Sequence, residues 1–227
     1  MSGWTAGDVS ASETLVDAPA PTGDHIYASH INELRQAVQI SNGKNVKNYG
    51  VVGDGINDDT DALNAILLLG GNIYFPAGTY LISNSLEYVS NSFIHGAGRG
   101  NTIIKQKDNA NRGGAWGLLQ PRGYGQGNPL GISIPGTPLA TNVTISNLSI
   151  NGNKANNTGA AECLVMNKVK YGFISDVETY NATEVGINAD SENYAYPSTD
   201  TAISPVIATN CFSHDNAYDG YQVVSGL

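Results

Sequence analysis

The chain has 227 residues, a length that suits one elongated domain with a small appendage. Charged residues make up only 14% of it, and 20 acidic residues outnumber 11 basic ones, which gives a formal net charge of -9. This balance argues against a partner held mainly through phosphates, so we expect no nucleic-acid partner. No apolar stretch approaches the ~18 residues of a membrane span, and the N-terminus lacks the pattern of a recognisable signal peptide, so we expect no membrane partner.

The first 45 residues differ in composition from the rest of the chain. Residues 1–24 are polar, small and proline-bearing, which predicts an extended or flexible connector. In residues 25–45, Ile31, Leu34 and Val38 recur close to helical spacing, which predicts a short helical adaptor. Because this helix is short and amphipathic, we expect it to pack on another element.

An acidic cluster follows in "NYGVVGDGINDDTDALNAILLLGG", from residue 48 to residue 71. One interpretation is a catalytic or metal site. The other is architectural: Asp58 or Asp59 caps a helix, and Asp61 lies in its first turn near the positive end of the peptide dipoles. The run lacks the glycine and final glutamate of an EF-hand loop, and it lacks a phosphate-binding Gly-Lys-Ser/Thr motif. The architectural interpretation is therefore favoured.

The remainder of the chain predicts an all-β, turn-rich fold. Its many glycines and its short alternating stretches are typical of strands separated by tight turns. "SDVETYNATEVGI" aligns without a gap with "TNCFSHDNAYDGY", so that Ser175 corresponds to Thr209 and Ile187 to Tyr221. In a second, shorter alignment, "ISNLSI" fits "ISDVET", so that Ile145 corresponds to Ile174. Repeats of this length predict a β-solenoid whose coils bury their inner faces by stacking on one another.

The segments "NYGVVGDGINDDTDALNAIL", "GNIYFPAGTYLIS" and "IHGAGRGNTII" resemble the start of the pectate-lyase-like superfamily, which includes polysaccharide-degrading enzymes and bacteriophage tailspikes. The resemblance covers about residues 46–227. It implies a right-handed, single-stranded parallel β-helix in which the acidic segment forms the capping helix over the first coil. It specifies the fold and is nearly silent about the reaction.

The segment "HIYASHINELRQAV" is similar to connectors that precede such helices in phage tail and surface proteins. The resemblance therefore implies a virion (phage tail) or extracellular location, a homotrimer, and contacts with other tail or appendage proteins. Complete members of the family have many more coils than this chain. We accordingly expect either that the chain is a fragment or that a partner covers its last coil, since an open coil exposes unpaired strand edges.

Polysaccharide hydrolysis needs two carboxylates at a fixed separation, and elimination needs a base together with Ca²⁺-binding carboxylates. The outer faces of stacked strands offer such positions, because alternate side chains point outward and neighbouring strands lie about 4.8 Å apart. The candidate catalytic residues are acids of the last repeats, namely Asp176, Glu178, Asp215 and Asp219. The alternative is that these acids are simply solvated. No metal site is assigned, although Ca²⁺ is the ion that the lyase chemistry would require.

Two long insertions between strands carry aromatic, amide and charged residues of the kind that bind sugars, which present an apolar face edged with hydroxyl groups. The candidate carbohydrate-binding residues are Trp116, Arg122 and Tyr124 in the first insertion, and Tyr194, Tyr196 and Asp200 in the second. The alternative is that these side chains pack the insertions onto the solenoid or onto sister subunits.

Two functions from different classes follow. The sequence favours a structural or receptor-recognition segment of a tailspike, tail fibre or surface appendage, because the chain is short and its catalytic motifs do not match those of the family enzymes. The alternative is a carbohydrate-active enzyme, either a polysaccharide lyase or a glycoside hydrolase. The only cysteines, Cys163 and Cys211, have apolar neighbours and are expected to be buried free thiols.

Overall fold

The computed structural model describes residues 43–110, 116–124, 139–189 and 206–222. These residues are mostly β, with a single α-helix, α2 (Thr60–Leu67), and two short 3-10 helices, η1 (Val46–Tyr49) and η2 (Lys154–Asn156). The predicted connector 1–24 and all but the last three residues of the predicted adaptor 25–45 lie outside these ranges. The strands are β1 (Lys44–Asn45), β2 (Asp54–Asp58), β3 (Gly71–Phe75), β4 (Gly78–Ile82), β5 (Leu86–Tyr88), β6 (Ser92–Gly96), β7 (Thr102–Gln106), β8 (Trp116–Pro121), β9 (Ala140–Asn151), β10 (Ala161–Val165), β11 (Val169–Tyr180), β12 (Ile187–Asn188), β13 (Ile207–Thr209), β14 (Phe212–His214) and β15 (Tyr221–Gln222).

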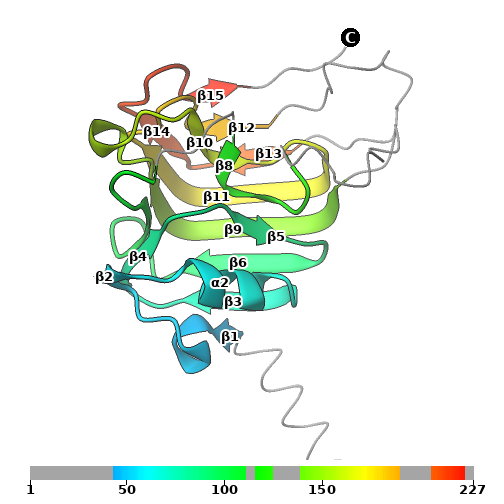
Figure 1. Ribbon diagram of the computed structural model, residues 1–227. Coiled ribbons are helices and arrows are strands. Elements are labelled where there is room, and N and C mark those ends of the chain that lie inside the picture. Colours follow the sequence, from blue (N-terminus) through cyan, green and yellow to red (C-terminus); the bar gives the residue numbers. More distant parts are fainter. Residues whose placement is uncertain (1–42, 111–115, 125–138, 190–205, 223–227) are drawn as a thin grey trace, which may run out of the picture. The chain divides into compact units, whose positions relative to one another are not determined.

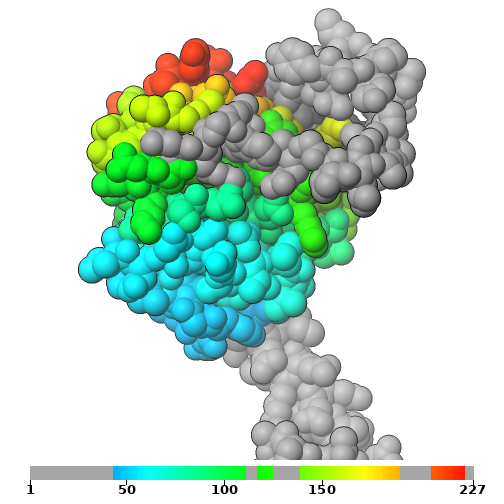
Figure 2. Space-filling view, in the orientation of Figure 1, coloured from blue at the N-terminus to red at the C-terminus, as the bar shows by residue number. Residues whose placement is uncertain are grey.

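Every strand pairing in the described part of the chain is parallel. The long, curved strands β9 and β11 pair along their whole length, and β6 and β7 both pair with β9 (Figure 1). A second sheet has the order β15-β12-β10-β8-β5. Successive passes of the chain therefore stack in sequence order, which the bands of colour from blue to red follow in Figure 2.

The strand register confirms both repeats that the sequence predicts. Ser175 pairs with Thr209, and Ile187 pairs with Tyr221, as the longer alignment requires. Ile174 pairs with Ile145, as the shorter alignment requires. The repeats correspond to neighbouring strands because parallel stacking puts equivalent positions of successive passes side by side.

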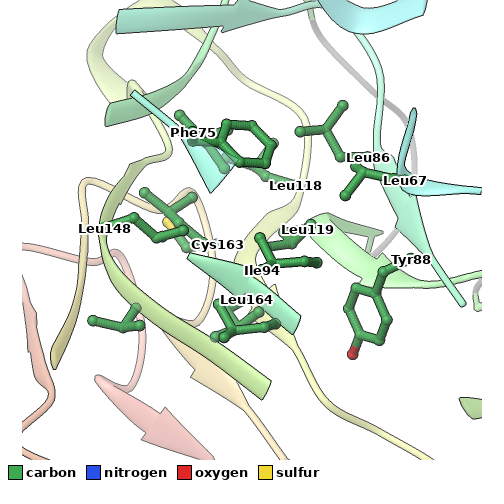
Figure 3. Close-up of a cluster of buried hydrophobic side chains, with 14 of the residues drawn as sticks. Leu67, Phe75, Leu86, Tyr88, Ile94, Leu118, Leu119, Leu148, Cys163 and Leu164 are labelled. Carbon is green, nitrogen blue, oxygen red and sulfur yellow. The ribbon is translucent and has the colours of Figure 1, made fainter. Parts of the chain in front are cut away.

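The core lies between the two sheets and is built from rows of identical or similar side chains (Figure 3). One row runs through Ile73, Ile94, Ile145 and Ile174, which pair in register on β3, β6, β9 and β11 and are fully buried. The facing sheet contributes a row of Leu86, Leu119, Leu164 and Ile187. Each pass alone would leave its apolar side chains exposed, so burial depends on the passes above and below.

The acidic cluster at the start of the fold has structural partners. The carboxylate of Asp59, which is 2% exposed, accepts hydrogen bonds from the backbone N–H groups of Val52 (2.7 Å) and Gly53 (3.0 Å). Asp58 accepts hydrogen bonds from the backbone N–H and the hydroxyl of Thr60 at the start of α2. These contacts support the architectural interpretation of the acids. Helix α2 buries Leu63, Ile66 and Leu67 against the core.

Bends in the long strands occur at residues in the left-handed backbone region. Asn147, Asp176 and Asn210 have φ values of 57°, 55° and 49° and occupy equivalent positions on successive passes. Asn and Asp tolerate this conformation better than most residues. Each bend interrupts the inside-outside alternation, so the outer surface changes direction between Ser175 and Val177.

Candidate functional site

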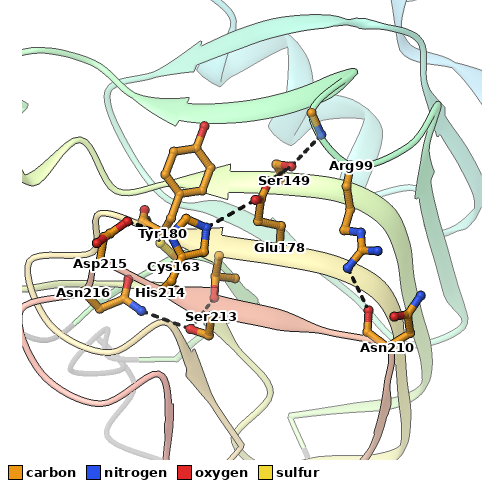
Figure 4. A network of polar contacts seen from close by, with 12 residues as sticks. Arg99, Ser149, Cys163, Glu178, Tyr180, Asn210, Ser213, His214, Asp215 and Asn216 are labelled. Carbon is orange, nitrogen blue, oxygen red and sulfur yellow. Dashed lines mark hydrogen bonds and ion pairs between the residues drawn. The ribbon is translucent and has the colours of Figure 1, made fainter.

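Charged, polar and aromatic side chains gather on the outer surface beyond these bends (Figure 4). They come from β9, β11 and β14, which are neighbours in the sheet, and from the loop between β6 and β7. We call this group the Glu178–His214 cluster. Its members are Arg99, Ser149, Glu178, Tyr180, Phe212, His214 and Asp215.

His214 lies between two carboxylates. Its Nε2 atom is 3.3 Å from Oε1 of Glu178, and its Nδ1 atom is 2.7 Å from Oδ2 of Asp215. The other carboxylate oxygen of Glu178 accepts a hydrogen bond of 2.6 Å from the hydroxyl of Ser149. The imidazole is therefore held in one orientation by hydrogen bonds at both ring nitrogens, while about 45% of its side chain stays accessible to solvent.

The pKa values of the cluster shift in the directions that keep all three groups charged. The hydrogen bonds with Asp215 and then with Glu178 raise the pKa of His214 above its usual 6.5. Partial burial opposes ionisation of Glu178, but hydrogen bonds from Ser149 and His214 outweigh it and lower the pKa of this carboxyl. The hydrogen bond with His214 likewise lowers the pKa of Asp215. The three shifts therefore favour the ionised carboxylates and the protonated imidazole over their neutral forms.

Aromatic rings flank the charged groups. The ring of Tyr180 stacks on His214 with centroids 5.4 Å apart and planes 3° from parallel. The guanidinium of Arg99 lies 4.9 Å from the centre of the Phe212 ring, and it donates a hydrogen bond of 3.2 Å to the carbonyl oxygen of Asn210. Phe212 is 58% exposed. The cluster therefore offers hydrogen-bond donors, acceptors and an exposed aromatic ring on one surface.

Two of the four acids that the sequence nominates, Glu178 and Asp215, belong to the Glu178–His214 cluster. Glu178 and Asp215 contact His214, whereas Asp176 accepts a hydrogen bond from the side-chain amide of Asn210 at the bend. Glu178 pairs with Phe212 and Asp176 contacts Asn210, as the longer repeat alignment implies. Asp219 is exposed between β14 and β15, and its backbone carbonyl accepts a hydrogen bond from Gly186. Whether any of these acids is catalytic stays a prediction.

The nominated sugar-binding residues mostly fall outside the described parts of the chain. Tyr194, Tyr196 and Asp200 lie outside them, as does the side chain of Trp116, whose backbone begins β8. Arg122 is exposed. Tyr124 is half-buried, and its hydroxyl accepts a hydrogen bond of 3.1 Å from the amide of Asn167 and lies 3.5 Å from the buried carboxylate of Glu162. These contacts of Tyr124 match the packing alternative.

Cys163 and Cys211 are free thiols, and their burial differs. Cys163 is fully buried in the core, as expected. Cys211 is only partly buried, so the expectation of two buried thiols is wrong for this residue. The reason is its position beside β14, which pairs only with β11 among the described strands. In the described ranges, no three or more His, Cys, Asp or Glu side chains are arranged so that they could hold a metal ion, and no helix there is long and apolar enough to cross a membrane.

Sequence reasoning missed Arg99, Ser149 and Tyr180. Tyr180 pairs with His214 in the register of the longer repeat, so the repeat alignment contained its position. Ser149 pairs with Glu178 in the register of the shorter repeat and was open to the same argument. No sequence signal pointed to Arg99, which lies 111 residues from Asn210 along the chain.

The parallel strands, the curved sheets and the shared core define a mostly β protein with solved structural neighbours of β-helix type. The model of the family described as "Rhamnogalacturonase A/epimerase, pectate lyase-like" matches residues 43–134. The resemblance of the N-terminal portion to the pectate-lyase-like superfamily is thereby confirmed.

Similar proteins come from phages and from a bacterium. The pre-neck appendage protein of Bacillus phage phi29 is 30% identical over 171 residues, which cover 74% of this chain and 18% of that protein. Mannuronan C5-epimerase AlgE5 of Azotobacter vinelandii is 29% identical over 191 residues, covering 78% of this chain and 17% of the epimerase. The chain thus spans less than a fifth of the length of either relative.

A solved structure of bacteriophage phi29 gene product 12 superposes with a TM-score of 0.63 at 22% identity, over 85% of this chain and 29% of that chain. The A-module of Azotobacter vinelandii mannuronan C-5 epimerase AlgE4 gives a TM-score of 0.52 at 19% identity, over 80% of this chain and 53% of that chain. At these identities the superpositions show a common fold and nothing more.

Proposed function

We propose that the chain is part of a phage-type virion appendage and recognises a polysaccharide through the Glu178–His214 cluster. The observation that carries this proposal is the placement of Glu178, His214 and Phe212 on one outer surface of the stacked strands. Ionised carboxylates and an imidazole match the hydroxyl groups of a sugar, and an exposed ring matches its apolar face. The appendage relatives from Bacillus phages support the location.

The fold proposal that accompanies this function is a right-handed, single-stranded parallel β-helix with α2 as its N-terminal cap. The contacts of α2 support the capping role, because the helix follows the first pass and packs on β5 and η1. The domain organisation in this proposal is a connector over residues 1–24, a helical adaptor over residues 25–45 and the β-helix over residues 46–227. The adaptor would attach the β-helix to other virion proteins, with the assembly a homotrimer.

The binding test uses the whole chain and a panel of capsular and pectic polysaccharides, with affinities measured by titration calorimetry. His214→Gln and Glu178→Gln should each weaken binding about tenfold or more, since hydrogen bonds to charged groups are among the strongest in such sites. Glu87→Gln on β5, in the other sheet, removes one carboxylate elsewhere and should leave the affinity unchanged. Equal affinities of all variants would overturn the assignment of the site.

A second candidate function is carbohydrate chemistry at the same cluster. The position of His214 between two carboxylates favours it, because a protonated imidazole is a general acid and an ionised carboxylate is a general base. Relatives named as mannuronan C5-epimerases and as alginate lyase 7 of Azotobacter vinelandii support this alternative.

Three readouts separate the possible reactions. Hydrolysis releases reducing ends, elimination produces unsaturated sugars that absorb ultraviolet light, and epimerisation exchanges a carbon-bound proton with solvent, which NMR detects in deuterium oxide. An active chain should lose its signal in His214→Gln and keep it in Glu87→Gln. Polysaccharide binding without any of the three signals would leave recognition as the function and reject the enzymatic candidate.

A further inference from the structure

We propose that a second carbohydrate-binding surface lies across β3, β6, β9, β11 and β13, and that its ligand is an extended, uncharged glycan. This surface precedes the bends at Asn147 and Asp176, whereas the Glu178–His214 cluster follows them along the same strands. We call it the aromatic strip. The proposal of this second site depends on different residues from the proposed function, so either proposal can be wrong while the other holds.

The strip consists of two outward rows defined by the parallel register. The first row is Asn72, Phe93, Thr144, Phe173 and Ile207, and the second is Tyr74, His95, Ser146, Ser175 and Thr209. The intervening row of buried isoleucines points to the core. Side chains alternate along a strand, so the two rows lie on the same outer face.

The aromatic strip contains rings that are partly exposed to solvent and rings that stack on one another. Phe93 is 41% exposed and Phe173 is 38% exposed. The ring of His95 stacks on both Tyr74 and Phe93, with centroids 5.0 Å apart in each pair. Burial lowers the pKa of His95, and one of its ring nitrogens lies 2.9 Å from the amide oxygen of Asn72. The lowered pKa favours the neutral form of the imidazole in this stack.

The pattern along the strip fits a sugar chain better than a protein partner. Phe93 and Phe173 lie two strands apart, with Thr144 between them, so their separation is about 10 Å. This is about the length of two linked pyranoses in an extended chain. Each ring can cover one apolar sugar face, while the partly buried Ser175 and the exposed Thr209 of the neighbouring row supply hydrogen bonds to hydroxyl groups.

The lack of charged residues in the aromatic strip indicates that its ligand is an uncharged glycan. None of the ten residues of the strip is Asp, Glu, Lys or Arg, although the whole chain has a net charge of -9. An anionic glycan would meet no cation within the strip and would be repelled by the acidic protein. The binding of a neutral glycan is weakened neither by the lack of cations in the strip nor by the negative charge of the chain.

The test measures binding of neutral polysaccharides, namely galactomannan, hydroxyethyl cellulose and dextran, by affinity electrophoresis of the full chain. Phe93→Ala and Phe173→Ala should each weaken binding to at least one of them about tenfold. Phe93→Tyr keeps a ring and should retain affinity. Tyr49→Ala removes an aromatic residue that is 49% exposed in η1 and serves as the matched control.

Two outcomes would overturn the proposal. One is that the wild-type chain binds none of the neutral glycans, or binds them equally well in both alanine variants. The other is that Phe93→Ala and Phe173→Ala lower the oligomeric state in sedimentation velocity while glycan binding persists, which would assign the strip to an interface between copies of this chain. His214→Gln should not change neutral-glycan binding, so the two sites are tested separately.

Discussion

Glu178 on β11 and His214 on β14 come from neighbouring parallel strands, and their side chains meet with 3.3 Å between Oε1 and Nε2. They are 36 residues apart in the chain. Parallel stacking brings them together, because equivalent positions of successive passes lie side by side on adjacent strands.

The titration of His214 should report its two carboxylate neighbours. We expect an apparent pKa above 6.5 for His214 in an NMR titration of the folded chain. Asp215→Asn should lower it more than Glu178→Gln, because the hydrogen bond with Asp215 is the largest cause of the shift. The His214→Gln spectrum assigns the signal among the four histidines of the chain. A wild-type pKa at or below 6.5 would contradict the geometry.

The same shifts give a sign for the pH dependence of stability. The folded-state pKa of His214 is raised, so its contribution is fully present below the unfolded-state pKa and is lost as the pH rises through the folded-state pKa. Glu178 and Asp215 have lowered pKa values, so their contributions are lost as the pH falls through those values. The stability difference between wild type and His214→Gln should therefore be largest in mildly acidic solution and shrink on both sides.

Asp59 should matter for folding and not for chemistry. Asp59→Asn leaves one acceptor oxygen for the two backbone N–H groups of Val52 and Gly53 and places an NH₂ group beside them. We expect a loss of about 1–3 kcal/mol in the free energy of unfolding, measured with urea. Asp61→Asn, an exposed change in the first turn of α2, should cost no more than about 1 kcal/mol. Equal losses would argue against the architectural role of Asp59.

Alanine substitutions at two glycines distinguish the destabilisation caused by backbone strain from that caused by a steric clash. Gly53 and Gly100 both have positive φ values, 64° and 73°. A Cβ atom at Gly53 would lie 2.5 Å from the buried ring of Tyr80, whereas a Cβ atom at Gly100 would meet nothing within 4 Å. Gly100→Ala should therefore cost about 1–2 kcal/mol from backbone strain alone. Gly53→Ala should cost clearly more in the same thermal or urea unfolding experiment, and similar costs would contradict the packing of Tyr80.

The two thiols should differ in reactivity. Burial raises the pKa of Cys163 to about 12, so its thiolate is scarce at neutral pH and is also inaccessible to reagents. Cys211 is only partly buried. Brief treatment of the native chain with iodoacetamide should modify Cys211, and mass spectrometry should find Cys163 modified only after denaturation. Rapid modification of Cys163 in the native chain would show that the core opens there.

The sequence indicates the stacking because the repeated unit is local. Ser175 and Thr209 belong to stretches whose alternation of small, polar and apolar residues recurs, and the structure pairs them as the alignment predicts. The structural role of the acids near Asp59 could also be predicted from the sequence, since helix starts and glycine turns use short-range hydrogen bonds. The extent to which Cys211 is buried could not be predicted from the sequence, because it depends on how many neighbouring strands cover β14.

By itself, then, the sequence determined that this chain stacks parallel strands, since residues one period apart must share a buried row. The repeat alignment also contained the pairing of Tyr180 with His214, but the tertiary structure alone decided which side chains face outward together beyond the bends. Bends at Asn147, Asp176 and Asn210 turn the outer surface, so alternation in the sequence no longer tells which way a side chain faces. Arg99 donates a hydrogen bond to the carbonyl oxygen of Asn210, 111 residues away along the chain, a contact that no local pattern encodes.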